Sequence, residues 1–381
     1  MTLKLLGGMS PTRFLRNYWQ KKPLLIRGAV PGFKGLLSRE ELFRLACEDE
    51  AQSRLVTQRN RKWDVRTGPF TNRDFSRLSN KNWTLLVQDV NHFLPSARAL
   101  LMNFQFIPYA RLDDLMVSYA PEGGGVGPHF DSYDVFLLQG PGRRLWQISA
   151  QQDKRLVDDA ALKILRDFRP EQEWILEPGD MLYLPPGYAH NGVAKDPCMT
   201  YSVGFRAPAY QELATQFLVY LQDHVVMEGM YSDPHLRMQP HPARISRDML
   251  RHVGTTLNKI NWNSEDVERF MGMYLTDPKP HVFFTPPSRP MSQREFEFQL
   301  CKGKGRLKLN LKSRMLCGEK NIFLNGDVYT AGATAHTQLE QLADLFILQD
   351  VEEFDDETLT LLYQWYTYGY VELELEGRPA R

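Results

Sequence analysis

The chain has 381 residues, of which 43% are apolar and 24% charged, so it is long enough for two or three domains of ordinary globular composition. Basic and acidic residues balance at 46 each, which gives the chain as a whole no attraction to nucleic acid or anionic membranes. The four cysteines are far apart, which predicts reduced thiols rather than disulfides or a zinc site. Without a signal peptide or a long apolar run, we expect a cytoplasmic protein with no membrane contact.

Short helices and strands alternate at the start of the chain. Ser38 and Glu41 have the spacing of a capping box, which predicts a helix from there to about Asp49. The other expected elements are helices at 12–20 and 92–105 and strands at 24–28, 52–66 and 83–87.

From Leu115 onward the sequence is rich in short β segments separated by Gly/Pro turns. The strands are expected at 115–120, 129–139, 144–149, 174–177, 181–184 and 199–205. Closely spaced strands with such turns favour an antiparallel sandwich or barrel over alternating β/α units.

After Pro208 the pattern becomes helical, and proline-rich linkers are expected at 231–243 and 277–290. The predicted elements are helices at 210–228, 245–260, 264–276, 292–301, 335–347 and 356–368, and strands at 305–313, 321–325 and 370–375. The mixed elements near the C-terminus are typical of a small winged-helix-like domain. We therefore predict a β-rich domain at 1–208, a helical region at 209–280 and a C-terminal α/β domain at 281–381.

The segment from Gly123 to Arg144 contains the first candidate for chemistry, His129-Phe130-Asp131. On a strand, residues two apart point to the same face, so His129 and Asp131 would project together. An imidazole and a carboxylate are two of the three ligands in the facial triad of non-haem Fe(II) oxygenases. His-x-Asp alone is a weak pattern, and the triad requires a second histidine.

His190 is the candidate for that second histidine. It ends the segment Glu177–His190, in which a tight turn, a short apolar strand and two prolines precede the imidazole. A strand pair in a barrel could bring His190 beside His129 and Asp131, although a lone histidine on a turn is commonly only a polar surface residue. The other histidines have no partner at ligand spacing: His92, His224, His235, His241, His252, His281 and His336.

Two adjacent arginines, Arg143 and Arg144, follow the predicted hairpin. Adjacent strand residues face opposite sides, so at most one of them points into a barrel. A buried arginine requires a carboxylate, which a 2-oxo dicarboxylate cosubstrate would supply; the alternative is a solvated surface pair. Ser118 could donate to the same carboxylate or be an ordinary sheet serine, and Gly123–Gly125 could border the opening or form a plain turn.

The motifs GPHFDSYDVFLLQGPGRRLW and LEPGDMLYLPPGYAHNG resemble the JmjC family of Fe(II)/2-oxoglutarate oxygenases. The segments FLRNYWQKKPLLIRGA and MTYSVGFRAP resemble its ribosomal-oxygenase branch. The resemblance implies a mainly β fold with added helices, a double-stranded β-helix (cupin) barrel. It further implies His129, Asp131 and His190 as catalytic iron ligands, and Arg144, supported by Ser118, as the 2-oxoglutarate-binding residues, with Arg143 facing away.

The same resemblance implies a reaction and partners. Bacterial members of this branch hydroxylate the β-carbon of an arginine in a large-subunit ribosomal protein, consuming dioxygen and 2-oxoglutarate and releasing succinate and CO2. The helices after Pro208 would form a homodimer, and the last domain would be winged-helix-like.

Three alternatives remain open from the sequence. A JmjC demethylase would use the same site on N-methyl groups, and only formaldehyde release would identify it. A non-oxidative metal-binding cupin would have no need for Arg144. Nucleic-acid binding through the C-terminal block is disfavoured, because residues 291–381 contain 10 basic and 15 acidic residues, a net charge of −5. Such a surface suits a basic protein partner, and an ordinary solvated run of charges is the alternative.

Overall fold

A computed structural model describes residues 2–59, 62–301, 305–348 and 354–375. The chain forms two compact units, one of Met1–Ala207, Pro278–Ser313 and Thr360–Arg381, the other of Pro208–Asp277 and Arg314–Leu359. The division predicted from the sequence at residues 208 and 280 stays a prediction.

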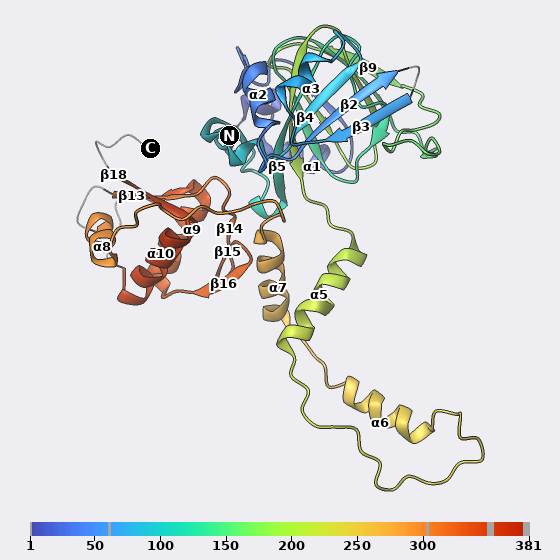
Figure 1. Ribbon diagram of the computed structural model, residues 1–381, viewed down its shortest axis with the longest axis vertical. Coiled ribbons are helices and arrows are strands. Elements are labelled where there is room, and N and C mark those ends of the chain that lie inside the picture. Colours follow the sequence, from blue (N-terminus) through green and yellow to red (C-terminus); the bar gives the residue numbers. More distant parts are fainter. Residues whose placement is uncertain (1, 60–61, 302–304, 349–353, 376–381) are drawn as a thin grey trace. The chain divides into compact units, whose positions relative to one another are not determined.

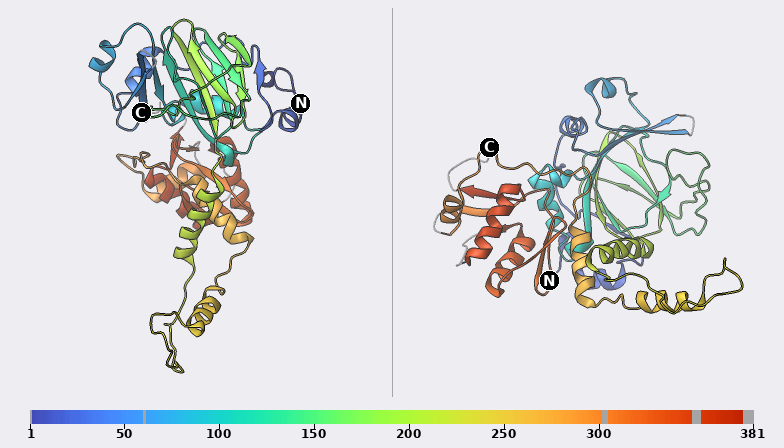
Figure 2. Two further views of the ribbon diagram at one scale, coloured as in Figure 1. Left: turned by 90° about the vertical axis from the view of Figure 1, so that its right-hand side faces the viewer. Right: turned by 60° about the horizontal axis from the view of Figure 1, so that its bottom comes forward.

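Two antiparallel sheets, shown in Figure 1, form the centre of the first unit. The larger sheet has the order β1-β10-β7-β12-β5-β4-β2-β3, and the smaller one β6-β11-β8-β9. Figure 2 shows the strands curving around a common interior. The two sheets are separate ladders rather than one closed sheet, and their antiparallel strands with added helices agree with the predicted mainly β fold.

The strands of the larger sheet are β1 (Leu24–Ile26), β2 (Ser53–Arg59), β3 (Lys62–Thr67), β4 (Trp83–Val87), β5 (Leu112–Ala120), β7 (Val135–Gln139), β10 (Met181–Leu184) and β12 (Cys198–Phe205). Those of the smaller sheet are β6 (His129–Phe130), β8 (Arg144–Ser149), β9 (Gln172–Leu176) and β11 (Ala189–Ala194). The helices of this region are η1 (Lys4–Leu6), α1 (Pro11–Asn17), α2 (Arg39–Leu45), α3 (Asn72–Ser76), η2 (Val90–His92), α4 (Pro95–Met102) and η3 (Tyr109–Arg111).

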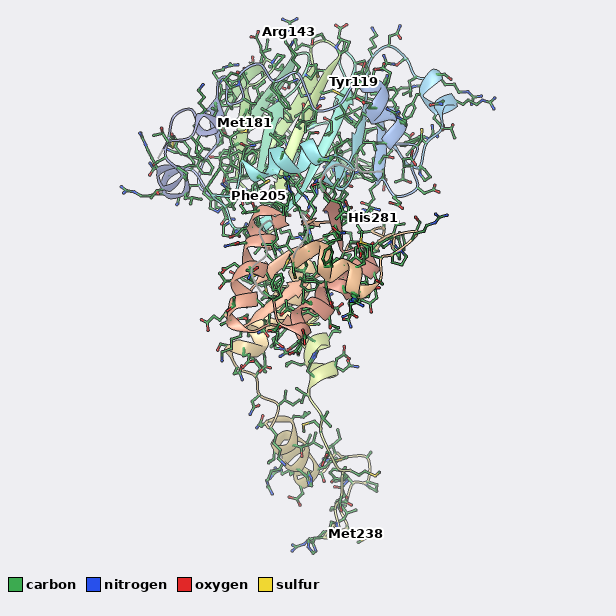
Figure 3. All side chains as sticks on the ribbon, turned by 90° about the vertical axis from the view of Figure 1, so that its left-hand side faces the viewer. Tyr119, Arg143, Met181, Phe205, Met238 and His281 are labelled. Carbon is green, nitrogen blue, oxygen red and sulfur yellow. The ribbon has the colours of Figure 1, made fainter. Side chains whose placement is uncertain are left out.

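The outer face of the larger sheet packs into the main hydrophobic core. Alternate strand residues such as Leu85 and Val117 join buried residues of α1, α2 and α4 there. Tyr119, Met181 and Phe205, labelled in Figure 3, belong to this core. Helix α2 begins with the predicted capping box, in which the Glu41 N–H donates to Ser38 Oγ at 3.2 Å and the Ser38 N–H donates to the Glu41 carboxylate at 2.7 Å.

The inner face of the larger sheet meets the smaller sheet across a second, smaller core. Val135 and Leu137 of β7 pack there with Trp146 and Ile148 of β8 and with residues of β10. Since strand residues alternate between faces, the residues between the outer-core positions, Thr84 and Ser118 among them, point into the interior.

The prediction of one strand over 129–139 was wrong. The chain forms β6 and β7, which lie in different sheets and are separated by four residues. Asp134 in this bend is fully buried, and its carboxylate accepts hydrogen bonds from the Tyr183 hydroxyl at 2.6 Å and from Gln20 Nε2 at 2.9 Å. These bonds satisfy a buried charge that fixes the bend between the sheets.

The remaining elements of the first unit are α8 (Gln293–Cys301) and the antiparallel strands β13 (Gly305–Leu309) and β18 (Val371–Leu375). Helix α10 (Asp356–Tyr368) contains the boundary between the units at Leu359. The second unit contains α5 (Tyr210–His224), α6 (Arg247–Leu257), α7 (Ser264–Thr276), β14 (Met315–Cys317), β15 (Asn321–Leu324), β16 (Asp327–Thr330), α9 (Ala333–Leu345) and β17 (Ile347–Leu348).

Helices α5 and α7 pack through Tyr220, Leu221 and Phe270, whereas α6 has no buried residue. Some of the charged residues counted in the C-terminal block 291–381, including Lys302, Lys304 and those at 350–353, lie outside the described residues. Within the described part of the chain, no helix has the length and apolar character needed to cross a membrane.

Candidate active site

Two paired strands bring the three predicted metal ligands together. His190 of β11 lies directly opposite His129 of β6 in the antiparallel ladder, and Asp131 follows β6 immediately. The imidazole rings lie 4.2 Å apart between centroids, and His190 Nε2 is 3.5 Å from Asp131 Oδ2. One ligand atom from each residue lies within 4.8 Å of the others, a spacing that suits a single metal ion.

Backbone carbonyls orient both imidazoles. Nδ1 of His129 lies 2.9 Å from the Gly127 carbonyl, and Nδ1 of His190 lies 3.0 Å from the Tyr188 carbonyl. Because a carbonyl only accepts, each Nδ1 carries the proton and each Nε2 keeps its lone pair for a metal. Burial, reinforced by the neighbouring His129, lowers the pKa of His190 to about 4, so this imidazole is neutral at physiological pH.

The glycine-rich segment before β6 packs tightly against the strand of His190. The Gly123 N–H donates to the Ala194 carbonyl, and the Ala194 N–H donates to the Gly124 carbonyl, both at 2.9 Å. A Cβ on Gly124 would lie 2.1 Å from the Trp83 carbonyl oxygen, and one on Gly125 would lie 2.5 Å from that of Gly192. The glycines therefore allow a close approach of three backbones beside the metal-ligand strand.

Arg144 and Arg143 point in opposite directions, as strand alternation predicts. Arg144 is 4% exposed, and among the residues that the structure describes its Nε and Nη2 have no hydrogen-bond partner. Arg143 lies on the outside of the barrel (Figure 3), where its Nε contacts Asp196 Oδ2 at 2.7 Å. A buried guanidinium without an anion is costly, so the interior around Arg144 suits a ligand carboxylate.

Ser118 faces the same interior from the larger sheet. It is 5% exposed and lies opposite Thr200 of β12 and Leu86 of β4. Sequence reasoning did not identify Trp146, whose ring lies 5.8 Å from the Arg144 guanidinium carbon and 5.9 Å from the His190 ring. Because Trp146 is two residues after Arg144 on β8, strand alternation could have identified it as facing the same interior.

The sequence did not predict β11, the strand that carries His190. Its residues, AHNGVA, are poor in β-branched side chains, and it is held instead by pairing with β6 and β8 on both sides. A strand pair was expected to bring His190 beside His129, and the structure places it in β11 between β6 and β8, where it is 3% exposed; the alternative of a histidine on a surface turn is wrong.

A cupin-like barrel with two histidines and one carboxylate at a common point, and an unpaired arginine facing the same interior, is the arrangement of JmjC-type oxygenases. The family model described as "JmjC domain" matches residues 99–213, and the model "ROXA-like winged helix" matches residues 259–372.

Comparison with known proteins gives the same class. The chain is 37% identical to the Escherichia coli protein "Ribosomal protein uL16 3-hydroxylase" over 84% of this chain and 83% of that one. A structure of YcfD, a ribosomal oxygenase from E. coli, superimposes with a TM-score of 0.82 at 33% identity, covering 96% of this chain and 98% of that one. A YcfD structure in complex with cobalt and 2-oxoglutarate matches with the same TM-score over 95% and 98% of the two chains. The chain belongs to the JmjC ribosomal oxygenases, which confirms the resemblance found in the sequence.

Proposed function

We propose that this protein is an Fe(II)- and 2-oxoglutarate-dependent hydroxylase that acts on the β-carbon (C3) of an arginine in the large-subunit ribosomal protein uL16. The observation that carries the proposal is the unpaired, buried Arg144 facing the same interior as the His129, Asp131 and His190 donors. The relative named as a uL16 3-hydroxylase, 37% identical over most of both chains, supports the substrate. A ribosomal substrate also supports a cytoplasmic location.

In this proposal His129, Asp131 and His190 hold Fe(II) on one face. Two neutral imidazoles and a carboxylate suit Fe(II) and leave positions open for other ligands. When iron, 2-oxoglutarate and dioxygen are bound, they supply the oxidative chemistry: the substrate C–H becomes C–OH, and 2-oxoglutarate becomes succinate and CO2.

The chain's own residues place the reactants. Arg144 would neutralise the distal carboxylate of 2-oxoglutarate, and the Ser118 hydroxyl would donate to the same group. Trp146 is buried, and its ring lies 5.8 Å from the Arg144 guanidinium carbon and 5.9 Å from the His190 ring, so an apolar surface adjoins both residues. Carbonyls of Gly127 and Tyr188 keep both Nε2 lone pairs available for the metal.

A demethylase of N-methylated side chains would use the same site, so formaldehyde release remains the discriminating measurement. The non-oxidative cupin is the weaker alternative, because such a protein does not require a buried unpaired arginine facing the interior.

We also propose that α6 contributes to a homodimer. Its apolar side chains, 38% to 59% exposed, recur along one side of the helix at Met249, Leu250, Val253 and Leu257. A stripe of this kind on a helix without buried residues suits a second copy of the chain. Leu250→Glu is expected to shift the dimer to a monomer in light scattering, and an unchanged mass would contradict this role.

The decisive experiment is mass spectrometry of purified uL16 after incubation with the protein, Fe(II) and 2-oxoglutarate. We expect one added oxygen on one arginine, with one succinate formed for each hydroxylation. An unmodified uL16 would contradict the substrate assignment. Formaldehyde release from an N-methylated substrate, with no stable hydroxyl product, would favour the demethylase.

A further inference from the structure

A group of unpaired donors lines the inner face of β2, β3 and β4, outside the residues assigned above. Nε of Arg54, Nε1 of Trp63 and Oγ1 of Thr84 are buried, and none has a hydrogen-bond partner within the described part of the chain. Buried donors without acceptors are uncommon in native proteins, and three of them on one surface indicate a ligand-binding site. We refer to Arg54, Trp63 and Thr84 as the donor wall.

The strand registers place the three side chains on one face. Thr84 is paired with Val56, Trp63 with Gln58, and Arg54 lies two residues before Val56 on β2. Paired residues and residues two apart share a face, so all three lie opposite Leu55, a member of the outer core. They therefore face the interior that also contains Ser118.

The donor wall borders the metal site. A Cβ on Gly127 would lie 3.1 Å from two ring atoms of Trp63, so the indole packs directly on the residue whose carbonyl orients His129.

The chemistry of the donor wall indicates what it binds. Indole and guanidinium nitrogens donate only, so the ligand must present acceptor oxygens. The three residues come from three adjacent strands and lie in successive same-face rows, about 6.8 Å apart along the strands and about 4.8 Å apart across them, a spread that an extended chain of several residues can cover. The 2-oxoglutarate carboxylates already have Arg144 and the metal as partners in the proposed function, so they do not require this surface.

We propose that the donor wall binds main-chain carbonyls of the substrate polypeptide on either side of the hydroxylated residue. This inference rests on the proposed function and adds to it the surface that holds the substrate chain. The hairpin of β2 and β3 is then one side of the substrate entrance, and the metal ligands lie at its base.

The test measures KM for uL16 and KM for 2-oxoglutarate with the iron-loaded, full-length protein. Trp63→Phe and Thr84→Val each remove a donor and keep the shape, and Arg54→Met removes the guanidinium and keeps an apolar stem. Each is expected to raise the KM for uL16 about three- to tenfold, the effect of losing one hydrogen bond, without changing the KM for 2-oxoglutarate. Thr84→Ser keeps the hydroxyl and is expected to keep the wild-type KM.

Two matched controls lie close to the donor wall. Arg66→Met removes an arginine of the same hairpin that pairs with Asp74, and Trp83→Phe removes an indole N–H that already donates to the Ser79 carbonyl at 2.6 Å. Neither is expected to change the KM for uL16.

A raised KM for 2-oxoglutarate with an unchanged KM for uL16 would overturn the assignment and make the donor wall part of the cosubstrate site. Unchanged values of both would also overturn it. A wild-type protein that leaves uL16 unmodified would contradict the proposed function itself, and this inference with it, before any variant is compared.

Discussion

The two faces of the larger sheet differ in what their side chains contact. On the outer face, Phe136 is fully buried and its ring centroid lies 4.8 Å from that of Tyr183 and 5.0 Å from that of Phe104. On the inner face, Thr84 is 1% exposed and its hydroxyl has no hydrogen-bond partner among the described residues. The outer face is completed by the chain itself, whereas part of the inner face carries donors that the described residues leave unpaired, so substitutions on the two faces are expected to separate stability from activity.

The largest expected effect is the loss of turnover on removal of a metal ligand. Asp131→Ala is expected to abolish succinate formation that depends on uL16, because two imidazoles alone no longer define a three-ligand site. Circular dichroism is expected to show a folded protein. The matched control is Asp134→Asn, which alters a buried structural carboxylate. Its main effect is expected to be a lower melting temperature. Full turnover by Asp131→Ala would remove this residue from the site.

On the outer face, Phe136→Ala is expected to lower the free energy of unfolding by about 3–5 kcal/mol, because it leaves a cavity among aromatic rings. Urea denaturation measures this change. The KM for 2-oxoglutarate of the fraction that remains folded is expected to equal that of the wild type. A raised KM without lost stability would show that the two faces are not separable.

On the inner face, Arg144→Met is expected to have the opposite profile. The KM for 2-oxoglutarate should rise about 30-fold or more, the effect of truncating one partner of a buried charge pair. The ligand-free protein should keep or gain stability, because a buried unpaired charge has been replaced by an apolar side chain. Arg143→Met removes the neighbour that pairs with Asp196 at the surface, and it is expected to leave both the KM for 2-oxoglutarate and the stability close to those of the wild type. An unchanged KM in Arg144→Met would assign the cosubstrate carboxylate to another residue.

The smallest expected effect is a pH dependence of the free energy of unfolding, caused by Asp114 of β5. Burial, with Asp89 nearby, raises the pKa of Asp114 to about 7. A carboxyl whose pKa is raised in the folded state stabilises the fold below its unfolded pKa, and this contribution is lost as the pH rises through about 7. Asp114→Asn removes that loss, so urea denaturation should show the variant gaining stability relative to wild type between pH 5 and pH 8. A constant difference across this range would contradict the raised pKa.

The sequence predicted the chemistry of the site better than it predicted the strands that carry the site. Strand alternation predicted that His129 and Asp131 project together and that at most one of Arg143 and Arg144 faces inward, and the structure buries Arg144. The choice of Arg144 and the role of each residue came from the family resemblance. The capping box at Ser38 was also predictable, since it depends on residues three apart.

The remainder depends on contacts that are distant in sequence. The strand break between β6 and β7 is fixed by Asp134, whose partners Tyr183 and Gln20 lie 49 and 114 residues away. Strand β11 has weak local propensity and exists because β6 and β8 pair with it on both sides. The donor wall could not be predicted either, because an unpaired Arg54 differs from a solvated one only when the register of β2 is known.

Main-chain contacts align the predicted metal ligands. The Gly187 N–H donates to the Asp131 carbonyl at 2.8 Å, and the β6–β11 ladder aligns His129 with His190. In zinc fingers the metal-binding energy is folding energy, so a chelator unfolds the protein. Here main-chain pairing aligns the ligand residues, so we expect chelation to leave a folded protein whose turnover returns when Fe(II) is added.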